Sequence, residues 1–341
     1  MNNNRLEILL RHRPAAGIAL EVAPYFNPAL PKAAGNTVLI VDVFDTETLR
    51  ARALLDPNIP DDRISEIEEV DIVGDASGIG ELMASHALTG KVSFIVSSHN
   101  FEHLPNPIRF LRGVQDALKP GGILSMAIPD FRATFDHFRS PTRLVDWLEA
   151  YHNHHAQPTS NSIFDLATNA AEFPIGTTLA GSADWRTFDP QKTRLSGNLR
   201  DAYEDWTAAR TEIRDYVDTH VSVISDLHFR LMVEDLRHLG LIDLEILEIT
   251  NNHGHEFFAH LRRPVTPVQS EDPATYKIRR EAMLLQIAAG LGDQAFPYVR
   301  SMMVKEYRRK RWLRSIVGET IFDRFQTWNK LRKRKRANRN H

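Results

Sequence analysis

The sequence predicts an α/β fold built on a mostly parallel sheet. Two observations predict it: a series of short apolar runs, typical of strands buried on both faces, and segments with helical spacing between most of these runs. Strands that alternate with helices in this way form parallel sheets that are covered on both sides. The apolar runs are residues 17–23, 37–43, 70–74, 92–98 and 122–128.

Three of the segments between these runs have helical spacing. They are residues 46–55, 79–86 and 107–118. In the last of them, apolar side chains three or four residues apart predict one buried helix face. These side chains are Ile108, Leu111, Val114 and Leu118.

The alternation stops after the fifth run. Residues 131–219 are rich in aromatic, His, Pro and Asp residues and contain no apolar run, so we expect a mostly helical insertion there. Helical spacing returns over residues 221–239, and Gly240 provides a stop signal. The side chains expected to be buried in this helix are Val223, Leu227, Leu231, Leu236 and Leu239.

Two strands are expected near the end of the domain. Residues 244–250 and 256–261 are apolar runs joined by a short polar link, which favours an antiparallel hairpin. Residues 263–275 contain three prolines and predict a linker, and a helical segment follows over residues 276–291.

The composition is that of an ordinary globular protein. Of 341 residues, 42% are hydrophobic and 25% are charged, which argues against disorder. The absence of cysteine excludes disulfides, thiolate metal sites and a cysteine nucleophile. There is no run of about 18 apolar residues. Because residues 1–13 also lack the pattern of a secretory signal, we expect a cytoplasmic protein.

The formal charge of −2 conceals a strong asymmetry. Residues 301–341 carry 14 Lys and Arg against three acidic residues, a net charge of +11. The other 300 residues carry 28 basic and 41 acidic side chains, a net charge of −13. The acidic body gives no support to a nucleic-acid partner, so any such partner depends on the tail.

Polar side chains follow the strands at the edge where ligands bind in open α/β sheets. Glu21 and Asp42 close the first two runs, and Asp75 follows the third. An acid closing the second strand is placed to bind ribose hydroxyls, and one after the third to bind an adenine amino group. Asp residues in these positions also cap helices and shape turns, so a structural role stays open for each.

The fourth and fifth runs are followed by candidates for proton transfer. His99 and His103 come after the fourth run, and a histidine is a suitable base at neutral pH. For His103 a packing or helix-start hydrogen bond is the alternative. Asp130 and Arg132 follow the fifth run, where they are placed to position an acceptor, although Arg132 equally fits a structural ion pair.

Residues 94–130, FIVSSHNFEHLPNPIRFLRGVQDALKPGGILSMAIPD, resemble the class I S-adenosylmethionine-dependent methyltransferases. The element LKPGG (residues 118–122), in which Pro120 ends the helix and the glycines allow the turn into the fifth strand, matches that family residue for residue. The resemblance implies a Rossmann-like seven-stranded sheet of order 3-2-1-4-5-7-6, with strand 7 antiparallel. It assigns residues 1–130 and 220–262 to this domain.

The resemblance also implies roles for individual residues. Glu21 and Ala23 mark the first loop around S-adenosylmethionine, and Asp42 binds its ribose. Asp75 with Ala76 contacts the adenine. Ser98 and His99 line the methyl-transfer side. His99, His103 and Asp130 are therefore the catalytic candidates.

The first loop departs from the family pattern. The family has glycines where this chain has Ala23, Tyr25 and Asn27. Glycine lets the backbone approach the cofactor closely, whereas Tyr25 places a large ring there and Pro24 fixes its own φ. Two readings stay open: an active methyltransferase, and a non-catalytic module that keeps the fold for interaction. The absence of Gly-x-Gly-x-x-Gly after the first strand disfavours a nicotinamide dehydrogenase.

More narrowly, the chain resembles methyltransferase-domain proteins of bacterial surface-polysaccharide clusters. The residues that carry this likeness include 21–28, 98–103 and 129–132. It implies that the acceptor is a sugar hydroxyl of a surface glycan or its precursor. Residues 131–219 are then expected to form an acceptor-binding lid, since specificity is built from such insertions.

Two histidine groups raise the question of a metal. Neither has carboxylate or cysteine partners at a recognised spacing, so we expect no metal site. The groups are His152, His154 and His155, and His253, His255 and His260.

The C-terminal extension, residues 276–341, ends in a basic amphipathic segment. From 308 to 336 apolar side chains recur three or four apart, with Arg and Lys clusters on either side. This pattern is typical of an interfacial helix on an anionic membrane. Packing on the protein body or on a second subunit, and binding to nucleic acid as in an RNA methyltransferase, are the alternatives.

Overall fold

The computed structural model describes residues 3–57, 59–184, 188–209, 217–250, 253–266 and 271–295. The chain divides into two compact units, Met1–Glu281 and Ala282–His341. The first unit contains the sheet and every residue that the sequence predicts to form the site. In the second unit, the described residues are the C-terminal part of helix α10 (Pro273–Ala295).

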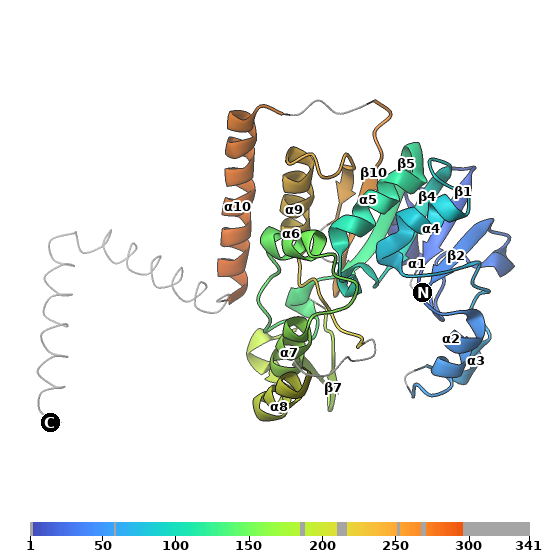
Figure 1. Cartoon of the computed structure of the whole chain (residues 1–341). Helices are drawn as coiled ribbons and strands as arrows, with labels where there is room; N and C mark the ends of the chain where they lie inside the picture. The colour runs from blue at the N-terminus through green and yellow to red at the C-terminus, as the bar shows by residue number, and fades with distance from the viewer. Residues whose placement is uncertain are drawn as a thin grey trace, which may run out of the picture. The chain divides into compact units, whose positions relative to one another are not determined.

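A seven-stranded sheet organises the first unit (Figure 1). Its order is β3-β2-β1-β4-β5-β10-β9, and β10 is antiparallel to both of its neighbours. Strands β6, β7 and β8 belong to the insertion. When they are left out of the numbering, β9 and β10 become strands 6 and 7 and the order is the predicted 3-2-1-4-5-7-6, so the Rossmann-like fold is confirmed. The strands are β1 (Ile18–Val22), β2 (Val38–Asp42), β3 (Ile72–Val73), β4 (Val92–Ser98), β5 (Leu118–Pro129), β9 (Glu245–Ile249) and β10 (Glu256–Arg262).

Helices cover both faces of this sheet. The larger apolar cluster combines sheet residues with helices on one face, and a second cluster lies under the N-terminal helix. The helices of the first cluster are α4 (Ile79–Ser85), α5 (Pro107–Ala117), α6 (Leu144–His152) and α9 (Asp226–His238). Two short helices, α2 (Thr46–Ala53) and α3 (Asp61–Ile64), enclose a third cluster.

Helix α5 shows how the sequence specifies an element. The Asn106 side chain accepts a hydrogen bond from the Arg109 N–H, and Pro107 occupies the first helical position, where its missing N–H costs nothing. The predicted apolar face is fully buried. On the other side the backbone approaches α4 so closely that a Cβ on Gly113 would lie 2.5 Å from the Gly80 nitrogen.

The N-terminal helix α1 (Asn3–Leu10) is absent from the sequence prediction. The segment looks polar, and its only apolar run is Ile8-Leu9-Leu10. Leu9 is nevertheless completely buried against the sheet, and its carbonyl accepts a 2.5 Å hydrogen bond from the Ser125 hydroxyl. A single turn of apolar side chains is enough to cover the sheet face there.

The turn into β5 differs from expectation. Helix α5 already ends at Ala117, and β5 starts at Leu118 rather than after the glycines. A register shift opposite β4 absorbs the extra residues, and Gly121, at φ +80°, donates its N–H to the Arg263 carbonyl. The glycine therefore serves the left-handed bend that joins the strand to its neighbour.

The insertion is helical, as expected, and also contains a small sheet. Strand β6 pairs antiparallel with both β7 and β8. The elements of the insertion are α6, α7 (Ser160–Asn169), β6 (Ala171–Ile175), β7 (Thr178–Ala180), β8 (Arg194–Leu195) and α8 (Leu199–Ala209). These strands are short and partly exposed, which explains why no apolar run marks them. Within the described residues, five 3-10 turns complete the elements: Lys32–Ala34, Ala76–Gly78, Phe101–His103, Phe131–Ala133 and Pro190–Lys192.

The predicted helix 221–239 is wrong at its N-terminal end. Helix α9 starts at Asp226, because the preceding segment is held by hydrogen bonds from the Val221 and Ser222 N–H groups to the Glu102 carbonyl. Leu239 is 55% exposed, contrary to prediction. The stop at Gly240 is confirmed, with φ +69°.

The final hairpin is confirmed, and the last helix starts earlier than predicted. Helix α10 begins at Pro273, within the segment expected to be a linker. The Tyr276 hydroxyl donates to Asp235 of α9, and Arg280 pairs with the same carboxylate. None of the described helices is long and apolar enough to cross a membrane.

Candidate functional site

The predicted site residues of β1, β2 and β4 lie at one edge of the sheet. These parallel strands are neighbours, so their carboxyl ends are adjacent. The chain leaves β1 toward β2 on one side and reaches β4 on the other, which makes this the switch point where ligands bind in such folds.

The backbone at this edge is strained. Of the described non-glycine residues, five have positive φ, and three of them lie here: Ala23 and Tyr25, both at 49°, and His99 at 52°. L-residues pay about 1–2 kcal/mol for this conformation. Such strain concentrates at functional sites. The first loop therefore keeps a left-handed backbone at two of the positions where the resembling family has glycine.

Glu21 shapes this loop from beneath. Its carboxylate is buried and accepts hydrogen bonds from the N–H groups of Ala29 (2.6 Å) and Leu30 (2.9 Å). Burial raises the pKa of Glu21 to about 7, against the opposing effect of these two hydrogen bonds. The Tyr25 ring packs with Phe26 onto the apolar cluster of α2 and α3.

The two acids predicted to hold ribose and adenine are both present at strand ends. Asp42 is the last residue of β2 and is buried; one of its oxygens accepts from the Phe44 N–H at 3.1 Å. Burial raises the pKa of Asp42. Asp75 caps the turn that contains Ala76, accepting from the Ser77 N–H at 2.9 Å. The cofactor contacts of Asp42, Asp75 and Ala76 stay predictions.

His99 is the centre of an ionic cluster after β4. Its Nε2 lies 2.9 Å from Glu256, which opens β10, and Arg5 of α1 bonds to the same carboxylate at 2.6 Å. Arg5 also donates to the Ser98 hydroxyl at 2.7 Å. The His99 ring keeps 37% of its side-chain surface exposed, so it is held by protein on one side and open on the other.

The charges of this cluster shift the pKa values of both His99 and Glu256. Burial lowers the pKa of His99, but the hydrogen bond to Glu256 and the negative charge of Glu102 outweigh it, so the pKa is raised. Burial raises the pKa of Glu256, yet the hydrogen bonds from His99 and Arg5 bring it down to about 2. At neutral pH, Glu256 is therefore a fixed negative charge behind the imidazole.

The Glu256→Gln variant tests this coupling. If neutral His99 is the base, activity rises with pH as His99 loses its proton. Removing the charge of Glu256 lowers the pKa of His99, so the rising limb of the pH–rate profile is expected to move to lower pH. The control is Glu245→Gln, which breaks an exposed pair with Arg262. An unchanged limb in the Glu256 variant contradicts the coupling.

His103 lies in a second cluster. Its Nδ1 is 2.8 Å from Asp218, and its ring meets the His220 ring edge-on at 4.7 Å. His220 in turn binds Asp136 at 2.5 Å. The edge-on contact with His220 is the packing role that the sequence left open for His103, and its catalytic role stays a prediction.

Asp130 is fully buried beside Arg132. Its two oxygens receive the guanidinium of Arg132, which also reaches Asp226 at the start of α9 (2.8 Å). Arg132 thus forms the structural ion pair that the sequence left open. With both oxygens engaged, Asp130 is placed to position neighbouring segments, and its catalytic role stays a prediction.

Several partners in these clusters were not predicted. Arg5, Asp136, His220 and Glu256 lie far in sequence from the residues they bind. For Glu256 a signal existed: the antiparallel pairing of the last strand with the fifth sets it opposite Pro129, at the same sheet edge as His99.

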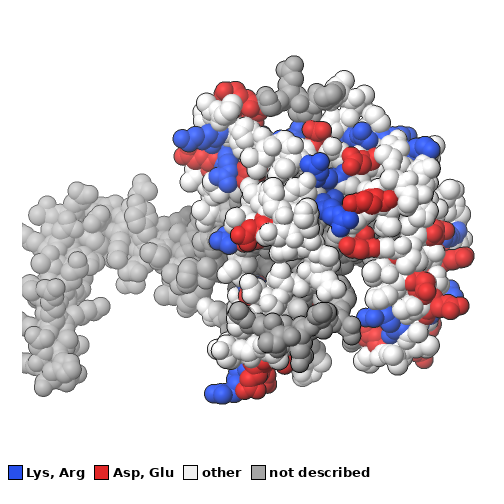
Figure 2. Space-filling model, viewed as in Figure 1, with Lys and Arg blue, Asp and Glu red and all other residues white. Residues whose placement is uncertain are grey.

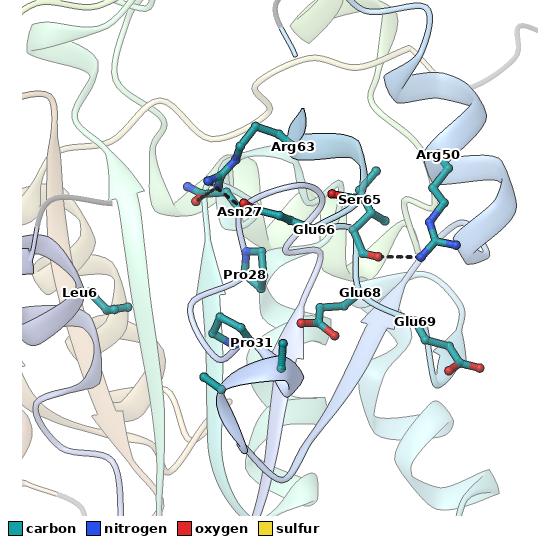
Figure 3. A pocket seen from close by; sticks show the side chains of 13 residues that line it. Leu6, Asn27, Pro28, Pro31, Arg50, Arg63, Ser65, Glu66, Glu68 and Glu69 are labelled. Atoms are coloured by element: carbon teal, nitrogen blue, oxygen red, sulfur yellow. Dashed lines mark hydrogen bonds and ion pairs between the residues drawn. The ribbon is translucent and has the colours of Figure 1, made fainter. Parts of the chain in front are cut away.

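The structure also contains a cavity of about 860 Å³ (Figure 3). It is formed by the segment that links β1 to β2 and by the residues before β3. Arg63 points toward Asn27, and Arg50 toward the Ile67 carbonyl. None of the predicted site residues lines this cavity.

Residues 24–173 match the model of a family described as a methyltransferase domain. Similar solved structures include S-adenosylmethionine-dependent methyltransferases from three organisms. That of Mesorhizobium loti is 14% identical, with 76% of this chain and 98% of that chain covered and a TM-score of 0.37. The structure from Aquifex aeolicus is 13% identical, with 75% of this chain and 88% of that chain covered and a TM-score of 0.35. The structure from Methanosarcina mazei is 11% identical, with 76% of this chain and 98% of that chain covered and a TM-score of 0.36.

No curated protein is significantly similar to the chain in sequence. The fold assignment therefore rests on the strand order, and the match to a methyltransferase-domain model covers residues 24–173, less than half of the chain. The basic amphipathic segment 308–336 lies outside the described residues.

Proposed function

We propose that the chain is an S-adenosylmethionine-dependent methyltransferase that methylates a hydroxyl group, specifically that of a sugar in a surface glycan or its precursor. One observation carries the proposal: three strained residues, Ala23, Tyr25 and His99, follow the neighbouring strands β1 and β4 at the switch point of the sheet, and the third is a histidine backed by a carboxylate. The family match to a methyltransferase domain supports it.

The described residues fit the cofactor. The left-handed backbone at Ala23 and Tyr25 keeps the loop shape that glycines would adopt, and the Tyr25 ring is packed on the α2–α3 cluster. Asp42 is at the end of β2, where ribose hydroxyls bind in folds of this kind. S-adenosylmethionine supplies a methyl group activated by its sulfonium charge.

The chain supplies orientation and a place for the proton. Glu256, which is itself bonded to Arg5, holds the His99 ring through Nε2, and Nδ1 is left to accept the proton of the acceptor hydroxyl. The negative charges of Glu256 and Glu102 stabilise the resulting imidazolium. Holding the hydroxyl near the methyl group supplies a further large part of the rate.

The acceptor class follows from the resemblance and from charge. On the face in Figure 2, Lys and Arg lie among Asp and Glu, so the described part offers there no wholly positive surface for a nucleic-acid backbone. We propose that the insertion binds the sugar and that residues 308–336 hold the protein at an anionic membrane, where lipid-linked glycans occur.

The test is transfer of a labelled methyl group to lipid-linked oligosaccharides and, separately, to RNA. Label in an O-methyl sugar supports the proposal. Label in RNA that disappears with the tail would support the RNA methyltransferase instead. No transfer to any acceptor, with no binding of cofactor, would support a non-catalytic module.

The Asp42→Ala variant tests the cofactor contact. Loss of hydrogen bonds from ribose hydroxyls to a charged acceptor is expected to raise the KM for S-adenosylmethionine by about 10- to 100-fold. The matched control is Asp45→Ala, which removes an exposed acid three residues away that caps α2. Equal KM values in the two variants would exclude the role of Asp42.

A further inference from the structure

Glu102 is a buried carboxylate without a hydrogen-bond partner. Its side chain is 1% exposed, and within the described residues neither oxygen accepts a hydrogen bond. An ionised carboxylate in this state costs several kcal/mol unless a positive charge compensates it. The site therefore calls for a cation close to these oxygens.

Three imidazoles face one oxygen of Glu102. His103 Nε2 lies 3.6 Å from Oε1, His220 Nε2 3.9 Å and His99 Nδ1 3.7 Å. These distances are too long for hydrogen bonds. The ligand atoms of Glu102, His103 and His220 all lie within 4.8 Å of one another. Two ligands of a tetrahedral ion at about 2.0–2.1 Å are roughly 3.4 Å apart, which is close to the distances of 3.6 Å and 3.9 Å from Glu102 to His103 and His220.

The far side of each imidazole is held by a carboxylate. His220 Nδ1 binds Asp136 at 2.5 Å, and His103 Nδ1 lies 2.8 Å from Asp218. In His220, an N–H donated from Nδ1 to Asp136 leaves the Nε2 lone pair directed toward Glu102. This carboxylate–histidine arrangement is the usual support of metal-binding histidines.

The supporting groups are fixed in turn. Arg139 is buried, donates to Asp136 at 2.6 Å and to the His220 carbonyl at 2.9 Å, and so ties this carboxylate to the segment that carries the histidine. The Glu102 carbonyl accepts the N–H groups that follow His220. His220 and the backbone of Glu102 are thereby tied to each other through buried contacts.

We propose that Glu102, His103 and His220 form a binding site for a divalent transition-metal ion of the Zn²⁺ class. Two imidazoles and one carboxylate favour zinc, iron or cobalt over magnesium and calcium, which prefer oxygen ligands. Three protein ligands leave at least one position open. Because His220 is more than a hundred residues from the other two ligands, no sequence spacing reveals the site.

The site adjoins the proposed base. His99 Nδ1 faces the same carboxylate oxygen, so an ion bound there lies close to it. On the assumption of the proposed function, the open position is available to the oxygen of the acceptor hydroxyl, whose pKa a metal ion lowers.

The test measures metal binding directly and does not depend on methyl transfer. The full-length chain, freed of metal by a chelator, is titrated with Zn²⁺ by calorimetry and with Co²⁺ by visible absorption. We expect binding of about one ion per chain and a Co²⁺ spectrum of low-coordinate type. The Glu102→Gln variant keeps the side-chain size and removes the unpaired charge, so it is expected to fold and to bind at least about 100-fold more weakly.

Two further variants separate the site from its rivals. Asp136→Asn is expected to weaken binding by about 10- to 100-fold through the orientation of His220. His12→Gln alters another His–Glu group, His12 with Glu248 and His260, and is expected to leave binding unchanged. Absence of binding by the wild-type chain, or loss of binding in His12→Gln with retention in Glu102→Gln, would overturn the proposal.

Discussion

Replacement of His99 by Gln is expected to lower kcat for methyl transfer by about 10²- to 10⁴-fold, the range for loss of a positioned base. Gln keeps a hydrogen bond to Glu256 but cannot take the proton of the acceptor hydroxyl. The KM for S-adenosylmethionine is expected to change little, since the proton is removed from the acceptor. Steady-state kinetics with saturating cofactor measure both constants.

His86→Gln provides the control for this variant. His86 is an exposed histidine after α4, bonded to the Leu82 carbonyl, and its loss is expected to leave kcat unchanged. A His99→Gln enzyme with kcat within a factor of three of the wild type would show that another group takes the proton.

Replacement of Arg132 by Met is expected to lower the free energy of unfolding by about 3–5 kcal/mol. The methionine fills similar space, but Asp130 and Asp226 are then left buried without their shared cation. Chemical denaturation of the two proteins measures the difference. Adding Asp226→Asn removes one of the stranded charges and is expected to restore part of the loss.

The matched control is Arg143→Met. Arg143 forms an exposed ion pair with Asp146, and such pairs contribute at most about 1 kcal/mol. If the Arg132 and Arg143 variants lose equal stability, the buried pair does not fasten the start of α9 to the segment after β5.

The sequence predicts the sheet well because its strands are buried on both faces. The runs from Val92 and from Thr37 are near-continuous stretches of apolar residues, and strands of this kind can be recognised from the local sequence alone. The strands of the insertion leave none, since β7 and β8 are exposed or half-buried two- and three-residue pieces. The predicted start of helix α9 is wrong for a different reason. The residues before Asp226 are held out of the helix by hydrogen bonds to the Glu102 carbonyl, and these bonds join segments more than a hundred residues apart.

The site is predictable in its strand-end residues and not in their partners. Asp42 and His99 follow apolar runs, so topology alone brings them to one edge. Glu256 is brought to His99 by the pairing of β10 with β5, and His220 is brought to Glu102 by the path of the insertion. The positive φ of Tyr25 is also invisible in the sequence, where a large ring in place of glycine suggests a blocked loop.

Calorimetric titration of the full-length chain with S-adenosylhomocysteine tests the central claim most directly, because it examines the strained first loop and Asp42 without requiring the acceptor. The account predicts saturable binding that Asp42→Ala weakens and Asp45→Ala does not. An absence of binding at millimolar ligand would contradict it and would leave the chain a non-catalytic member of this fold.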